Sequence, residues 1–201
     1  MMSMQSIGVV VEDELSGAVM RRLIATTGRN FIIDRMINAR GNGQIKSGIE
    51  KFRTSSYALP HIVLTDLDRY PCPPVLLNDW GAIDLPPQFL FRIAVREVES
   101  WLLADREGIA EFLHVAVSKV PHAPEAEVDP KRTLLNLARR SRKKRLAQEL
   151  VPAPGSSAQI GPLYNARLCE FVNDRWNVEQ AKLLADSLSR TLYRLSEFLP
   201  G

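Results

Sequence analysis

Four short apolar runs alternate with amphipathic stretches along the first half of the chain. Each run is rich in Val, Ile, Leu or Phe without strict alternation of polar and apolar residues, which is typical of parallel strands buried on both faces. The runs cover residues 7–11, 31–37, 61–65 and 89–95. Between them, apolar residues recur at helical spacing, as Leu15, Val19 and Leu23 do. This pattern predicts an α/β domain over residues 1–117, with a mainly parallel sheet, flanking helices and right-handed crossovers.

The second half of the chain contains helical patterns and linkers but no further strand pattern. A helix is predicted over residues 98–112, and a linker rich in Pro, Ala and Glu follows it. Asp129 and Pro130 are a typical N-cap and first helical residue, which predicts a helix from residue 130 to about residue 150. We expect residues 118–201 to form a helical extension packed on the α/β domain.

A leucine-rich stripe predicts a final helical stretch over residues 177–199. Its apolar positions are Ala181, Leu184, Ala185, Leu188, Leu192, Leu195 and Leu199. We expect this stripe to pack against the core. The alternative interpretation is a homodimer interface.

Composition narrows the class of protein. Hydrophobic residues make up 45% of the chain and charged residues 24%, a balance typical of a soluble globular protein. No apolar run approaches the ~20 residues that cross a bilayer, and no secretory signal is recognised, so we expect no membrane partner. Cys72 and Cys169 are isolated, which favours a cytoplasmic location over a disulfide framework or a zinc site. The net charge of +3 is a weak indication of a polyanionic partner.

Acidic residues follow three of the four predicted strands. Glu12 follows the first strand, Asp66 and Asp68 follow the third, and Glu97 follows the fourth. Parallel strands present their carboxyl ends at one edge of a sheet, where ligands bind, so these side chains are expected to lie close together. Carboxylates that close repel one another unless a cation lies among them, and oxygen ligands suit Mg²⁺ or Mn²⁺. The alternative for any one acid is turn formation or helix capping.

The acidic pattern resembles two known architectures. Residues 9–14 and 61–68 resemble the first and third strands of a response-regulator receiver, which would make Asp66 a phosphoacceptor beside Mg²⁺ held by Glu12 and Asp13. A receiver also carries Ser or Thr after its fourth strand and a Lys-Pro pair at its fifth. This chain has Arg96 and Glu97 after the fourth strand and no Lys-Pro pair.

The second resemblance is to the TOPRIM fold of topoisomerases, primases and OLD-family nucleases. Glu12, Asp66 and Asp68 match its order of a Glu after the first strand and an Asp-x-Asp after the third. Residues 92–105, 129–131 and 161–165 resemble segments of an uncharacterised, TOPRIM-like bacterial family, so the likeness covers nearly the whole chain. Asp13 and Tyr70 depart from the glycine and the third acid that many TOPRIM proteins carry, which brings the set closer to OLD-type nucleases.

This resemblance implies a Mg²⁺-dependent nuclease or related nucleic-acid-processing protein. Asp66, Asp68 and Glu12 would hold Mg²⁺ (or Mn²⁺), with Glu12 as general acid/base and Glu97 as a second catalytic carboxylate. Analogy with OLD-type nucleases also implies a role in phage defence or repair and a partner protein such as an ATPase. From the residues alone, Glu97 is as readily a salt-bridge partner of Arg92 or Arg96, and Glu99 favours a helix dipole.

Two further segments are candidates for binding phosphate groups. One is the loop with Gly41 and Gly43, flanked by Arg40 and Lys46, which lacks the Walker A spacing and for which loop formation is an equal explanation. The other is a basic stretch without acids, whose members include Arg139, Arg140, Arg142, Lys143, Lys144 and Arg145. It predicts salt-sensitive attraction to nucleic acid, and a solvated helix face is the alternative. The alternative function is a non-catalytic module, either receiver-like signalling at Asp66 or a TOPRIM shell that binds nucleic acid without cutting.

Overall fold

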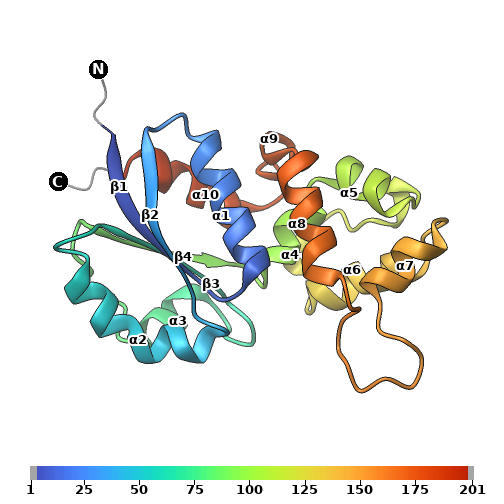
Figure 1. Ribbon diagram of the computed structural model, residues 1–201, viewed down its shortest axis with the longest axis horizontal. Helices are drawn as coiled ribbons and strands as arrows, with labels where there is room; N and C mark the ends of the chain where they lie inside the picture. The colour runs from blue at the N-terminus through green and yellow to red at the C-terminus, as the bar shows by residue number, and fades with distance from the viewer. Residues whose placement is uncertain (1–3, 199–201) are drawn as a thin grey trace.

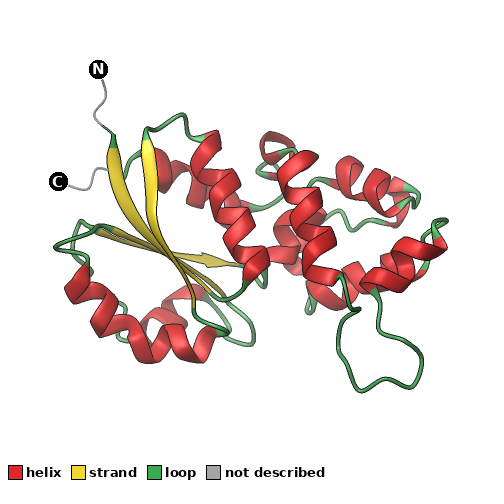
Figure 2. Ribbon diagram, in the orientation of Figure 1, coloured by secondary structure: helices red, strands yellow, loops and turns green. Residues whose placement is uncertain are grey.

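The computed structural model describes residues 4–198, which form a four-stranded parallel sheet in the order β2-β1-β3-β4. The strands are β1 (Gln5–Val11), β2 (Phe31–Asn38), β3 (His61–Asp66) and β4 (Phe89–Ala94). The helices that connect them are α1 (Glu14–Thr26), α2 (Asn42–Ser55) and α3 (Pro73–Asp79). The predicted α/β architecture with a parallel sheet is therefore confirmed, and all of its strands lie in the left part of Figure 2.

Alternate residues of each strand face opposite sides of the sheet and divide the core into two clusters. From β1, Ile7, Val9 and Val11 join a cluster with α1, whereas Val10 joins a second cluster with α2 and α3. Figure 1 shows α2 and α3 on one face and α1 and α10 on the other. Burial on both faces explains why β1, β3 and β4 read as continuous apolar runs. Strand β2 lies at an edge of the sheet and is only partly buried, so the expectation of burial on both faces is wrong for this strand.

After β4, every regular element in the described part of the chain is a helix. The elements are α4 (Val98–Ala104), α5 (Arg106–Leu113), η1 (Val117–Lys119), η2 (Pro124–Ala126), α6 (Pro130–Arg139), α7 (Lys144–Leu150), α8 (Tyr164–Asp174), α9 (Val178–Ala181) and α10 (Asp186–Ser196). One apolar cluster runs from β1 and α1 through α4 and α6 to α8 and α10. The boundary near residue 117 stays a prediction, and the apolar core extends across it.

The three long helices predicted for this region are each divided in the structure. Asp105 separates α4 from α5, because its carboxylate accepts hydrogen bonds from Gly108 N (3.1 Å) and Asn177 N (2.8 Å). Residues 140–143 separate α6 from α7, where Arg142 N donates to His114 O at 3.3 Å. The final stretch divides into α9 and α10. These breaks depend on contacts with distant segments, which local periodicity does not record.

The C-terminal stripe packs largely inside the chain. Ala181, Ala185, Leu188 and Leu195 are buried, whereas Leu184 is 43% exposed. Leu199 lies outside the described residues. The homodimer interface stays a prediction.

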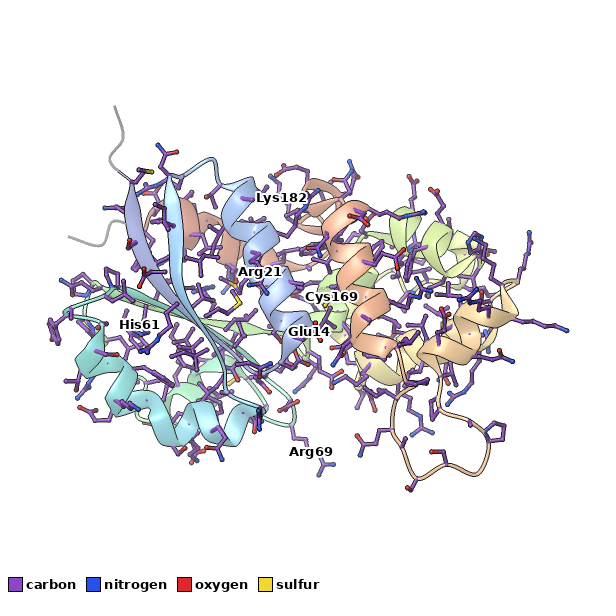
Figure 3. The ribbon with its side chains drawn as sticks, in the orientation of Figure 1. Glu14, Arg21, His61, Arg69, Cys169 and Lys182 are labelled. Carbon is purple, nitrogen blue, oxygen red and sulfur yellow. The ribbon has the colours of Figure 1, made fainter. Side chains whose placement is uncertain are left out.

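Helix α8 was not anticipated by the sequence pattern, although it is central to the helical region. Leu168, Phe171 and Val172 are fully buried in the cluster shared with α1. Figure 3 shows Glu14 on α1 facing Cys169 on α8, and Cys169 Sγ donates to Glu14 O at 3.7 Å. Helix α8 thus packs the helical region against the first helix of the sheet.

In residues 4–198, no helix combines the length and the apolar character that crossing a bilayer requires.

We predict that the sheet and the helical region unfold as one cooperative unit. Leu168→Ala should lower the free energy of unfolding by about 2–5 kcal/mol, because the methyl groups it removes are fully buried between α1 and α8. Urea denaturation followed by circular dichroism measures the change, and Leu163→Ala is the exposed control. Two separate transitions, with only the helical signal shifted by Leu168→Ala, would contradict the prediction.

Candidate functional site

The acids of β1 and β3 meet at the carboxyl edge of the sheet, as their positions after neighbouring strands require. Glu12 Oε1 accepts hydrogen bonds from Thr65 Oγ1 (2.6 Å) and from Asp66 N (2.7 Å). Burial raises the pKa of Glu12, and the negative charges of Asp68 and Asp13 raise it further, against the two hydrogen bonds that lower it. The Glu12 carboxylate is therefore fixed across the end of β3.

Asp66 is the most deeply buried of the strand-end acids, with 8% of its surface exposed. Its Oδ1 accepts a hydrogen bond of 3.0 Å from Val98 N, the first residue of α4. Burial holds the pKa of Asp66 well above its usual range, and the negative charges of Glu12 and Glu99 add to the rise. A cation close to Asp66 would relieve this repulsion.

On an extended chain, residues two apart such as Asp66 and Asp68 point the same way, but the backbone at Asp68 is not extended. Its φ of +49° is left-handed, so the extended geometry that would align it with Asp66 is interrupted. Its Oδ2 accepts a hydrogen bond from Asn42 Nδ2, at the start of α2. The Asp68 carboxylate is thus held toward α2.

Glu97 pairs with Lys131 of α6. Its Oε2 accepts from Lys131 N at 2.9 Å, and Lys131 Nζ lies 3.9 Å from Glu97 Oε1. The expected salt bridge to Arg92 or Arg96 does not form, because Arg92 donates to Thr191 Oγ1 and Arg96 to the main-chain oxygens of Asp68 and Tyr70. Burial, together with repulsion from Glu99, raises the pKa of Glu97 to about 7.

Glu99 has a larger role than the helix-dipole interpretation gave it. It is 1% exposed, accepts a 3.0 Å hydrogen bond from Tyr164 Oη of α8, and lies 3.5 Å from Lys131 Nζ. Its Oε2 has no hydrogen-bond partner among the described residues. The sequence contains a signal for this burial, because Glu99 stands in a helix whose other residues are apolar or small.

Lys131 is the cation that balances these acids. Burial alone would lower the pKa of Lys131. The negative charges of Glu99, Glu97 and Asp66 outweigh this effect and raise the pKa above its usual value. Within residues 4–198, no other cation forms an ion pair with Glu97 or Glu99. The basic stretch of the sequence begins with Lys131 and Arg132, but the sequence pattern gave no sign of this contact.

The carboxylates at this edge of the sheet are suitable ligands for a hard divalent cation, but the structure does not group them into a metal site. Glu12, Asp66 and Asp68 offer carboxylate oxygens whose mutual repulsion a divalent cation would offset. However, within residues 4–198, no three Asp, Glu, His or Cys side chains are grouped so that they could hold a metal ion. In this arrangement, Asp68 Oδ2 already accepts a hydrogen bond from Asn42 Nδ2.

An open cleft of about 720 Å³ lies between the strand ends and α6. It is lined by the acids Asp68, Glu97 and Asp129, by the basic residues Arg69, Arg96, Lys131, Arg132 and Arg139, and by Val128, Leu135 and Gln159. Figure 3 shows Arg69 extending outward from the connection after β3. Acidic and basic side chains therefore face one space beside the end of β3.

The residues of the predicted phosphate-binding loop lie in different surroundings. Gly41 caps α2 with a φ of +116° and donates its N–H to Glu12 O at 3.0 Å, while Arg40 and Gly43 are exposed nearby. Lys46 instead pairs with Asp79 at 2.6 Å, which directs it toward α3. The loop thus borders the Glu12 connection, but its lysine is already neutralised.

The basic stretch does not form one continuous face, because it spans two helices and a break. Arg139 lines the 720 Å³ cleft, whereas Lys143 and Arg145 line a separate cavity of about 310 Å³, and Arg145 pairs with Glu149 at 3.0 Å. The remaining members line neither of these two cavities and are exposed: Arg140, Arg142 and Lys144.

Compared with known protein families, with curated proteins and with solved structures, the chain matches none of them.

We predict a measurable pH effect from Glu97. Its pKa is 4.5 in the unfolded chain and about 7 in the folded protein, so the folded state holds this proton more tightly. The contribution of Glu97 to the free energy of unfolding should therefore fall as the pH rises from 4.5 to about 7, and stay low above that. Glu97→Gln should reduce this decline in urea denaturation across that range.

Glu50→Gln, at an exposed position on α2, is the matched control for Glu97→Gln. A ¹³C titration of the Glu97 carboxyl near the ordinary glutamate value would contradict the prediction, as would an unchanged decline in the variant.

Proposed function

We propose that this protein is a Mg²⁺-dependent nucleic-acid-processing enzyme that cleaves phosphodiester bonds. The observation that carries the proposal is the cleft in which acids of the strand ends face basic side chains. Acids can hold a metal beside a phosphate, and arginine and lysine bind the phosphate backbone. The resemblance of Glu12, Asp66 and Asp68 to the TOPRIM pattern supports the same chemistry.

Glu12, Asp66 and Asp68 are the residues proposed to hold the cation. When bound, Mg²⁺ supplies charge neutralisation at the phosphate and lowers the pKa of a coordinated water. Glu12 already accepts two hydrogen bonds in the structure, so its carboxylate is oriented before any substrate arrives. Its raised pKa suits a group that accepts and returns a proton.

Of the three proposed metal ligands, Asp68 lines the cleft. Further residues of the cleft are proposed to bind and orient the substrate. Arg132, Arg139 and Lys131 lie along one wall on α6, where they would hold phosphates adjacent to the scissile one. Glu97 has a pKa of about 7, so it can hold or release a proton near neutral pH as the second catalytic carboxylate.

A nucleic-acid-binding shell that does not cut is the second candidate function. It is favoured by the lack of a three-ligand metal group among residues 4–198 and by Lys131, which already balances Glu97 and Glu99. The receiver alternative gains no such support, because Asp66 is buried and accepts a hydrogen bond from Val98 N. Phage defence or repair, with a partner ATPase, is an expectation from the resemblance alone.

We predict that Mg²⁺ or Mn²⁺ will support cleavage of DNA or RNA, and that the strand-end acids are required. Asp66→Asn and Glu12→Gln should each lower the cleavage rate by at least about 100-fold, because each removes a proposed metal ligand. Asp34→Asn, on exposed β2, is the control. Binding without cleavage in the parent protein would support the shell, and cleavage unaffected by either variant would exclude the proposed mechanism.

We also predict that the two halves of the basic stretch differ in nucleic-acid binding. Arg132→Gln combined with Arg139→Gln should weaken binding and reduce the slope of log affinity against log salt by about 2, one unit for each lost phosphate contact. Lys143→Gln combined with Arg145→Gln changes the same charge but lines the separate cavity, so a smaller effect is expected. Equal effects in fluorescence anisotropy titrations would show that the cleft does not bind the backbone.

A further inference from the structure

Strand β4 forms an open edge of the sheet, on the side away from β3. The main-chain N–H and C=O groups of even-numbered residues in the range 88–94 face β3. For example, Gln88 O accepts a hydrogen bond from His61 N, and Ala94 O accepts one from Leu67 N. The odd-numbered groups face outward. At the ends, Phe89 N donates to Pro86 O and Val95 N to Ser187 Oγ. The outward groups of Phe91 and Ile93 have no such partner among the described residues, and an unpaired strand edge is a template for another strand.

A groove follows this open edge. A cavity of about 480 Å³ and one of about 260 Å³ share Leu77, Phe91 and Arg92 in their linings, so they are parts of one groove. Residues of α3 form one wall and residues of α10 form the other. The larger cavity is mostly apolar, with Pro73, Pro74, Ile93 and Val95 in its lining, and Leu85 and Pro86 line the smaller one. An extended chain has the shape to lie in such a groove.

Three arginines from β4 and α10 give the groove a positive character. Arg92, Arg190 and Arg194 contribute to its linings. Burial, together with the positive charges of Arg194 and Arg190, lowers the pKa of Arg92 to about 10, so nearby negative charge does not balance the guanidinium. Within residues 4–198, neither Arg92 nor Arg194 forms an ion pair with a carboxylate.

The acids that line the groove are already bound. Glu125 accepts hydrogen bonds from Ser187 Oγ, Ser187 N and Asp186 N at the start of α10. Asp186 pairs with Arg190 at 2.9 Å. Two arginine charges therefore remain for an occupant.

We infer that the open edge of β4 binds an extended, acidic segment of a partner protein as an additional strand. Main-chain hydrogen bonds to Phe91 and Ile93 would align the segment. Apolar side chains of the segment would pack against the walls, while its carboxylates would pair with Arg92 and Arg194. A second copy of this chain would bring its own Arg92 and Arg194 to the edge, so charge disfavours it as the occupant. This site lies along the side of the sheet and is independent of the proposed cleavage site.

The test uses a fluorescent hexapeptide of alternating glutamate and valine, with a hexapeptide of alternating lysine and valine as the charge control. The acidic peptide should bind, and its affinity should fall about tenfold in Arg194→Glu, because attraction becomes repulsion. Arg92→Gln, which retains a hydrogen-bonding side chain, should also weaken binding. Arg35→Glu, at an exposed position on β2 at the opposite edge, should leave affinity unchanged.

Residue-resolved hydrogen exchange locates the peptide. The amides of Phe91 and Ile93 should exchange more slowly when the acidic peptide is bound. A version of the peptide N-methylated at alternate residues should not bind, because it cannot form the ladder. Equal binding of both charge types, unchanged exchange at Phe91 and Ile93, or protection of these amides that grows with the concentration of the protein alone would overturn the inference.

Discussion

Crowding of negative charge at one edge of a buried sheet is the constraint around which this protein is built. Glu12 and Asp66 come from neighbouring strands, and Glu99 lies in the helix that follows the sheet. Burial raises the pKa of each, and the negative charge of nearby carboxylates raises it further. Lys131 approaches these groups from α6 and pairs with both Glu97 and Glu99. The helical region therefore supplies part of the electrostatic balance that lets the sheet carry so many acids. Its position beside the strand ends also creates the cleft that we propose as the site.

The features that could be predicted from the sequence are those determined by local pattern. Strands such as residues 61–66 are buried on both faces, so their apolar runs identify them, and the parallel order places their ends together. The limits of the helices could not be predicted in the same way. Asp105 ends α4 because distant Asn177 donates to it, and the break after α6 is fixed by Arg142 binding His114. Periodicity within one segment contains no information about such partners.

The candidate site could likewise be predicted from the sequence only in part. The sequence places Glu12, Asp66 and Asp68 at one edge, and the structure does bring Glu12 to the main chain of Asp66. The direction of each carboxylate could not be predicted, because it depends on the left-handed backbone of Asp68 and its contact with Asn42. Likewise, consecutive basic residues separate into different surfaces once α6 and α7 diverge. Residue type indicated the chemistry, whereas tertiary contacts decide which groups act together.

The hydrogen bond from Tyr164 to Glu99 has a consequence for how the chain can be divided. Helix α8 begins at Tyr164, and the same helix packs on α1, whose N-cap is Asp13, next to Glu12. A fragment that ends at residue 117 would retain the strands and α4. Without α8 it would expose the Glu99 carboxylate, which is buried in the full chain, and would uncover α1, the helix that follows Glu12. The strand-bearing half is therefore not a self-sufficient structural unit. Insertion of foreign sequence in the loop between α7 and α8 (Figure 1) would be better tolerated than removal of α8.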